Sequence, residues 1–148
     1  MDSQEALKLV STVRHEWMNR LQMISLYAAL EPDKLEGLYE RYRQHADEES
    51  ALIRLNVPAT SLVVIQANWE GRLTYSVSTD RVSLDDACVA DKLVRLLSGT
   101  DGPIHVTFTD GLTVRVFGNV PEGVFTPEEV YEQTVECSTF RLKDRRRR

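Results

Sequence analysis

The first third of the chain carries apolar residues at the spacing of two long amphipathic helices. Across residues 9–27 the apolar positions lie three and four residues apart, as on one face of a helix. The stripe comprises Val10, Trp17, Leu21, Ile24 and Ala28. The first helix is predicted to begin near Ser3, where Asp2 or Ser3 can cap it, and to run to about Leu30.

A second apolar stripe follows the break at Glu31-Pro32-Asp33, where proline disfavours continuation of the first helix and suits the first turn of the next. Its positions are Leu35, Leu38, Tyr39, Tyr42, Ala46, Glu49, Leu52 and Ile53, and the second helix is expected to end before Pro58. Two helices with one stripe each cannot enclose a core, so we expect two hairpins from two chains to form a four-helix bundle. The expected dimer seam is Val10, Trp17, Leu21, Ile24, Leu38, Tyr42 and Leu52. Arg20 is expected on the opposite side of its helix, outside this seam.

From residue 56 onward the pattern changes to mixed helix and strand. Residues 59–71 fit either a strand, because of Leu62-Val63-Val64-Ile65, or a helix capped by Thr60 or Ser61 and stopped by Gly71. The further predicted elements are a strand at 73–79, a helix from a Ser83/Asp86 capping box to Leu97, a hairpin at 104–116 turning at Asp110-Gly111, a short helix from Thr126 to about Thr134, and a strand at 136–142. The sequence therefore predicts an α+β protein with a helical hairpin at residues 1–55 and an α/β domain at residues 56–148.

Composition indicates a folded protein without a membrane segment. Of the 148 residues, 42% are hydrophobic, which is enough for a core. No apolar run approaches the roughly 20 residues of a membrane span, and the N-terminus lacks a signal-peptide pattern, so a cytoplasmic location is expected. Cys88 and Cys137 have no metal-binding or disulfide spacing and are expected to be reduced, buried thiols.

The charge is unevenly distributed along the chain. The net charge is −5, and residues 143–148, with one Lys, four Arg and one Asp, carry +4, which leaves −9 for the rest. An acidic body argues against a nucleic-acid partner. The run Arg145–Arg148 suggests phosphate binding, but a terminal charge block is typically a solvated tail, which is the interpretation we favour.

His15 lies off the apolar stripe of the first helix. Its helical column consists of Lys8, Ser11, Thr12, Met18, Asn19 and Gln22, with no carboxylate among them. The nearest acid, Glu16, flanks the ring. Taken alone, such a histidine is most often an ordinary exposed residue. His45 is best interpreted as a structural or surface histidine, and His105 as an exposed residue on the polar face of its strand.

The run Arg14-His15-Glu16-Trp17-Met18-Asn19-Arg20-Leu21-Gln22 resembles the phosphotransfer helix of the sporulation initiation phosphotransferase B-type family. It is less closely similar to the phosphoacceptor helix of sensor histidine kinases. This resemblance covers the first fifty-odd residues and implies a dimeric bundle with a phosphorylated His15. The family has a helix where residues 59–71 lie, so we expect a helix there. The family member compared is longer than this chain, and Asp is commoner in the family where this chain has Glu16.

The order of elements after the hairpin resembles a reduced histidine-kinase ATP-binding domain. The resemblance stops at the nucleotide site, because there is no Asp-x-Gly-x-Gly loop and the spacing within residues 118–123 is wrong. With seven single glycines, the chain has little means of surrounding a triphosphate with backbone N–H groups, so no ATP binding is expected.

The leading functional prediction is a phosphotransferase that passes phosphoryl groups between response-regulator aspartates through His15. Glu16 is expected to orient the ring, and Asn19, Arg14 and Lys8 to contact the phosphoryl group or the partner's acidic pocket. The protein is expected to hold no cofactor of its own, with Mg²⁺ supplied by the receiver domain. Three alternatives remain open: an ordinary exposed histidine, a non-catalytic dimeric module that binds response regulators, and a degenerate sensor kinase.

Overall fold

The computed structural model describes residues 2–142, and the predicted basic tail lies outside them. The chain forms two compact units, Met1–Glu49 and Ser50–Arg148. The division falls inside the second long helix, slightly before the boundary expected after residue 55. The α+β class predicted from the sequence is confirmed.

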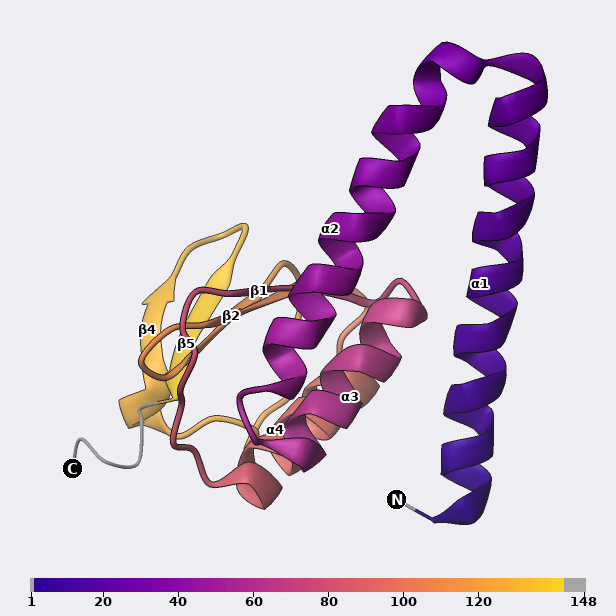
Figure 1. The fold of residues 1–148 in the computed structure, drawn as a ribbon. Coiled ribbons are helices and arrows are strands. Elements are labelled where there is room, and N and C mark those ends of the chain that lie inside the picture. The colour runs from indigo at the N-terminus through magenta and orange to yellow at the C-terminus, as the bar shows by residue number, and fades with distance from the viewer. Residues whose placement is uncertain (1, 143–148) are drawn as a thin grey trace. The chain divides into compact units, whose positions relative to one another are not determined.

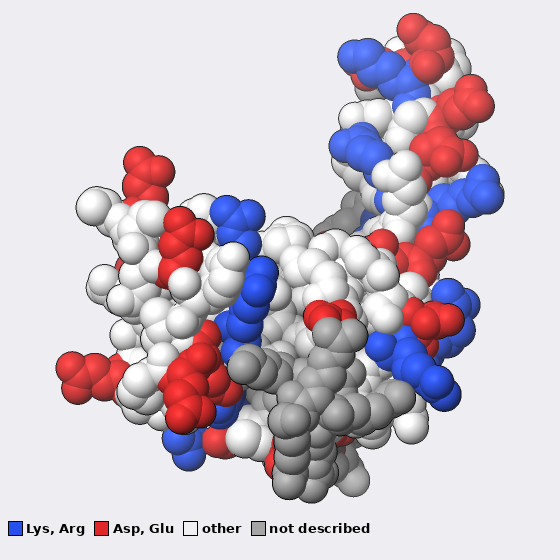
Figure 2. All heavy atoms as spheres, turned by 90° about the vertical axis from the view of Figure 1, so that its left-hand side faces the viewer, with Lys and Arg blue, Asp and Glu red and all other residues white. Residues whose placement is uncertain are grey.

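The first unit, here the helical unit, is a hairpin of two helices (Figure 1). It comprises α1 (Ser3–Leu30), the 3₁₀ turn η1 (Pro32–Lys34) and α2 (Leu35–Ile53), whose last turn belongs to the second unit. Asp2 caps α1 as predicted: its carboxylate accepts from the Glu5 N–H at 2.7 Å, and the Glu5 carboxylate accepts from the Asp2 N–H at 3.2 Å. Basic and acidic side chains are interspersed along the visible face of this hairpin (Figure 2).

Arg20 lies at the contact between α1 and α2. Its guanidinium stacks over Trp17 at 5.2 Å and over Tyr42 at 4.8 Å, and its Nη2 lies 2.8 Å from His45 Nδ1. The prediction that Arg20 lies on the side of its helix opposite Trp17 is therefore wrong. Arg20 follows Trp17 by three residues and so shares its side of α1, where the guanidinium packs between aromatic rings. His45 is a structural residue, as expected.

The apolar side chains of α1 are largely uncovered. None of its residues is buried, and in the described part of the helical unit Leu38 of α2 is the one buried side chain. The exposed residues Leu7, Val10, Trp17, Met18 and Leu21 follow one side of α1, and we call them the α1 stripe. Within it, Val10, Trp17 and Leu21 are 61%, 42% and 51% exposed.

This distribution corrects the predicted dimer seam. Leu38 is already buried within its own chain, and Ile24 and Tyr42 are half-buried. Leu52 is fully buried in the core of the second unit, because the last turn of α2 packs there. Of the seven predicted positions, Val10, Trp17 and Leu21 remain available to a partner.

The second unit, here the α/β unit, is a mixed sheet with two helices on one face (Figure 1). Its elements are α3 (Pro58–Trp69), β1 (Leu73–Val77), α4 (Asp86–Gly99), β2 (Ile104–Phe108), β3 (Leu112–Val116), the 3₁₀ turn η2 (Pro127–Glu129), β4 (Val130–Gln133) and β5 (Ser138–Leu142). The strand order is β1-β2-β3-β5-β4, with β1 and β2 parallel and the other pairs antiparallel. The helix at residues 59–71, the hairpin at 104–116 and the late strand are confirmed.

The core of this unit is formed by alternate strand residues and the inner faces of α3 and α4. Leu93 and Leu96 of α4 and Val106, Phe108 and Val114 of the sheet are fully buried. Strand side chains alternate between the two faces of a sheet, so the intervening residues point away from the helices.

The two helix starts differ from the predicted ones. Thr60 and Ser61 are buried inside α3, which begins at Pro58, and Asp86 caps this helix from outside. The Asp86 carboxylate accepts from the N–H groups of Ala59 and Thr60 at 2.9 and 2.8 Å. Helix α4 begins at Asp86 and is capped by Asp85, whose carboxylate accepts from the Cys88 N–H at 3.3 Å, and not by Ser83 as predicted.

The predicted helix from Thr126 to Thr134 is a single 3₁₀ turn followed by strand β4. The Thr126/Glu129 capping box is present, but residues 130–133 pair with β5. Lys92 of α4 also holds Glu129, with its Nζ 2.6 and 2.7 Å from the two carboxylate oxygens. Pairing with a neighbouring strand therefore overrides the local helical preference.

Candidate functional site

His15 lies near the middle of α1 and is exposed to solvent. Within residues 2–142 its ring makes no hydrogen bond and no ion pair. A neutral imidazole has one ring nitrogen with a free lone pair. The ring is therefore available to an incoming electrophile.

The predicted supporting residues lie at different angles around α1. Asn19 and Lys8 are exposed and lie one turn after and two turns before His15, on the same side of the helix. Arg14 is exposed and Glu16 half-buried, each rotated about 100° from His15 in opposite directions. Helical geometry thus places Asn19 and Lys8 in line with His15, with Arg14 and Glu16 on its flanks. The roles expected of these four residues stay predictions.

A shallow hollow lies on α1 just beyond His15. It is lined by Met18, Leu21, Gln22, Ser25 and Leu26. Met18 and Gln22 follow His15 by three and seven residues, and Leu26 follows it by eleven, so all three share its side of the helix. Sequence reasoning did not single out Ser25 or Leu26, although continuing this spacing by one more turn would have found Leu26.

The region expected to correspond to a nucleotide loop packs tightly onto α4. A Cβ atom added at Gly99 would overlap the Pro121 ring, and one at Gly102 would overlap the Phe117 carbonyl group. These two glycines are therefore required by close packing within the chain. The expectation that the protein binds no ATP stays a prediction.

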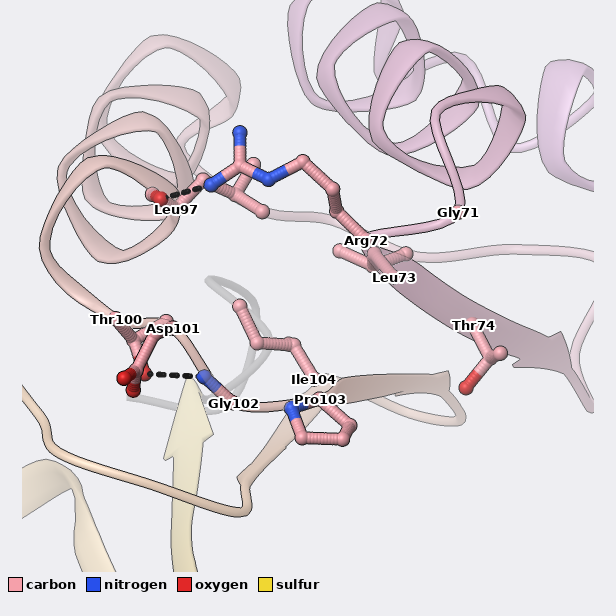
Figure 3. Close-up of a pocket in the computed structure, with 10 residues that line it drawn as sticks. All are labelled: Gly71, Arg72, Leu73, Thr74, Leu97, Thr100, Asp101, Gly102, Pro103 and Ile104. Carbon is pink, nitrogen blue, oxygen red and sulfur yellow. Dashed lines mark hydrogen bonds between the residues drawn. The ribbon is translucent and has the colours of Figure 1, made fainter.

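A second hollow, of about 420 Å³, lies where β1 and β2 begin (Figure 3). Its polar groups serve local structure: Arg72 donates to the Leu97 carbonyl at the end of α4, and the Thr100 hydroxyl accepts from the Gly102 N–H at 3.4 Å. Asp101 is the one acidic residue of its lining. The side chains that face one another here carry no evident reactive chemistry.

The remaining histidine and the cysteines occupy ordinary structural positions. His105 is half-buried, with its Nδ1 2.7 Å from the Thr74 hydroxyl oxygen, so it is less exposed than predicted. Burial, and secondarily the nearby Arg115 guanidinium, hold the pKa of His105 below its ordinary value of 6.5.

Both cysteines are free thiols. Cys88 is exposed because it lies on the outer side of the first turn of α4, so the prediction that it is buried is wrong.

Two searches for binding features cover only the described part of the chain. Within residues 2–142, no three His, Cys, Asp or Glu side chains are grouped so that they could hold a metal ion. No helix in that range combines the length and apolarity needed to cross a membrane.

The helical hairpin presents His15, whose ring makes no hydrogen bond within residues 2–142, from the middle of its first helix. Residues 1–55 match the family model described as Sensor_kinase_SpoOB-type, alpha-helical domain, and this segment spans all of α1 and α2. The predicted relationship to the sporulation phosphotransferase family is thereby confirmed for the helical segment. The match associates the protein with two-component or sporulation signalling, in a phosphotransfer or kinase-associated role. No curated protein matches the chain.

Proposed function

We propose that the protein is a phosphotransferase that relays phosphoryl groups between response-regulator receiver domains through His15, in a sporulation-type phosphorelay. The observation that carries this proposal is the His15 ring, which is exposed, has no hydrogen-bond partner among residues 2–142 and lies within a helix that matches the SpoOB-type domain. An exposed ring without a structural hydrogen bond is free to approach a partner protein.

The proposed first step is an in-line attack on an aspartyl phosphate. The lone pair of the unprotonated His15 nitrogen forms an N–P bond, and the bond between phosphorus and the aspartate oxygen breaks, with its electron pair going to the carboxylate. The second ring nitrogen keeps its proton. The reverse reaction on a second receiver restores the free imidazole, so no water or nucleotide is consumed.

The neighbouring side chains are proposed to orient the ring and bind the phosphoryl oxygens. Asn19 and Lys8, on the same side of α1 as His15, are placed to donate to those oxygens, and Arg14 adds positive charge on one flank. Glu16 is proposed to fix the ring orientation, through a water molecule. The receiver domain is expected to supply the aspartate and Mg²⁺.

The hollow beyond His15 offers an apolar surface for the same partner. Its lining alternates apolar Met18, Leu21 and Leu26 with the polar side chains of Gln22 and Ser25. An apolar patch with a few polar groups is typical of protein contact surfaces. We propose that the receiver domain contacts Gln22, Ser25 and Leu26 of this lining when its aspartyl phosphate meets His15, whereas Met18 and Leu21 belong to the α1 stripe.

The active form is proposed to be a homodimer joined through the α1 stripe. Burying a large apolar side chain stabilises an assembly by about 1.5–3 kcal/mol. The five side chains of the α1 stripe are therefore sufficient to drive association of two hairpins into a four-helix bundle, provided that most of their exposed area is covered.

The experiment that tests the proposal follows label from a ³²P-phosphorylated receiver domain to the protein. We expect label that is labile in acid and stable in base, and its loss in His15→Gln. The chain has three histidines, so His45→Gln and His105→Asn are matched controls and should accept label normally.

Two outcomes would reject the proposal in different ways. Equal labelling of His15→Gln would show that the phosphoryl group resides elsewhere. Tight binding of phosphorylated and unphosphorylated receiver domains with no label on the wild-type protein would instead indicate a non-catalytic binding module.

A further inference from the structure

In the sheet of the α/β unit, α3 and α4 cover one face, and no helix within residues 2–142 covers the other, which we call the open face (Figure 1). Inward residues such as Val106 and Val114 are fully buried, whereas the residues between them on the open face are not. The central positions of the open face carry hydroxyl groups, among them Thr107, Thr113 and Thr139. This face is polar and independent of the site at His15.

Negative charge is almost absent from this face. Strands β1, β2, β3 and β5 contain no Asp or Glu, although the chain contains 23 such residues. The one acidic residue of the sheet is Glu132 on the edge strand β4, in register with Thr139. The central strands of the open face are therefore electropositive within an acidic protein.

Two arginines supply this positive charge, and each is stacked on an aromatic ring. The Arg115 guanidinium lies 5.5 Å from the Phe117 ring centroid, and that of Arg141 lies 3.7 Å from the Tyr131 ring centroid. Both arginines are exposed, and neither pairs with a carboxylate among residues 2–142. Stacking restricts each side chain and leaves the N–H edge of the guanidinium directed away from the ring.

The register of the strands sets the spacing of the two charges. Arg115 of β3 is opposite Thr139 of β5, and Arg141 of β5 is opposite Thr113. Arg115 and Arg141 are thus diagonal neighbours, which lie about 7–8 Å apart across a sheet and somewhat closer at their Cβ atoms. This separation suits two carboxylates from alternate residues of an extended chain, which lie about 6.6–6.8 Å apart along a strand.

We propose that the open face binds an acidic polypeptide segment in an extended conformation. Carboxylates on alternate residues accept from Arg115 and Arg141, and the threonine hydroxyls between them satisfy the polar groups of the ligand. The spacing of Arg115 and Arg141, close to that of alternate residues in an extended chain, favours a polypeptide over a nucleic acid as the occupant. The proposal does not depend on phosphoryl transfer through His15.

The test uses the full-length protein and a fluorescein-labelled peptide of six Glu-Thr repeats, with six Gln-Thr repeats as the neutral counterpart. Fluorescence anisotropy at low salt should show saturable binding of the acidic peptide. The double substitution Arg115→Gln/Arg141→Gln should weaken binding at least about tenfold, since each lost charged hydrogen bond corresponds to roughly that factor. Arg95→Gln, which removes an exposed positive charge from α4, is the matched control and should change binding little.

A second readout locates the binding surface without relying on the variants. Titration of ¹⁵N-labelled protein should shift the amide signals of β2, β3 and β5 and leave those of α1 unchanged. Absence of saturable binding, equal binding of the neutral peptide, or an unchanged Kd in the double variant would each overturn the proposal. Tighter binding of a single-stranded DNA oligomer through the same two arginines would also overturn it, in favour of a nucleic-acid surface.

Discussion

The helical unit and the α/β unit differ in how completely they bury their apolar side chains. The α/β unit encloses a continuous core in which side chains such as Leu93, Phe108 and Val114 are fully buried. The described part of the helical unit buries one side chain, Leu38, and leaves Val10 and Leu21 more than half exposed. The α/β unit therefore holds its fold with its own contacts, whereas the helical unit presents apolar surface that is suited to association.

The largest expected effect is a charge placed in the α1 stripe. Leu21→Glu buries an unpaired carboxylate in the proposed dimer contact, which costs on the order of several kcal/mol and should produce monomers. Sedimentation of the wild type and the variant at micromolar concentration measures the oligomeric state of each. Gln44→Glu adds the same charge at an exposed position of α2 and should remain dimeric.

Each unit contains one tryptophan, which allows the same variant to be followed in both. Trp17 is 42% exposed on α1, and Trp69 is 8% exposed at the end of α3. In Leu21→Glu, the fluorescence emission of Trp17 should shift to longer wavelength. The emission of Trp69, recorded after Trp17→Phe removes the other tryptophan, should stay unchanged. A folded wild-type monomer that still accepts phosphoryl groups would refute the dimer argument and leave the role of His15 intact.

Leucine truncation should separate a buried core from an exposed helix. Leu93→Ala should lower the unfolding free energy of the α/β unit by about 2–5 kcal/mol, because it leaves a cavity in a fully packed region. Leu30→Ala, at a position that is 71% exposed, should change stability by at most about 0.5 kcal/mol. Urea unfolding monitored through Trp69 measures the effect of Leu93→Ala, and unfolding monitored through Trp17 measures that of Leu30→Ala. Similar losses of unfolding free energy in the two variants would contradict the difference in burial between the two units.

The cap that Asp86 provides to α3 should contribute measurably to the α/β unit. Asp86→Ala removes the acceptor of two backbone N–H groups at a helix N-terminus, at a cost of about 1–3 kcal/mol. Asp91→Ala removes an exposed carboxylate paired with Arg95 on the same helix and should cost about 0–1 kcal/mol. Equal midpoints of urea unfolding for the two variants would argue against the cap.

The smallest expected effect is on the pH dependence of stability. Because the pKa of His105 is lowered in the folded state, the unfolded state binds a proton more readily. Neutral His105 therefore contributes to the unfolding free energy above pH 6.5, and this contribution is lost as the pH falls through the folded-state pKa. His105→Asn should therefore flatten the change in unfolding free energy between about pH 7.5 and about pH 5.5. An unchanged slope would show that His105 does not contribute to it.

The sequence predicted most elements because their signals are local. The Asp2 cap, the Asp110-Gly111 turn and the alternation of residues 104–108 each act within a few residues, and the structure confirms them. The motif around His15 also predicted the family relationship, because a run of nine residues is specific where one histidine is not.

The errors concern residues whose roles depend on distant parts of the chain. Asp86 caps a helix 26 residues earlier, and residues 130–133 form a strand because β5 lies beside them. Arg20 was misplaced although it follows Trp17 by three residues and so shares its side of α1, and its contacts with Tyr42 and His45 of the other helix could not be predicted from periodicity. Periodicity identifies the side of a helix but not the packing partner of each residue.

The measurement that tests the central claim most directly is transfer between two receiver domains. One receiver carries ³²P on its aspartate, the second is unphosphorylated, and no nucleotide is added. The account predicts that label appears on the second receiver with wild-type protein and at background level with His15→Gln. Equal transfer in the presence of His15→Gln, or none with a folded wild-type protein that binds both receivers, would contradict a relay through His15.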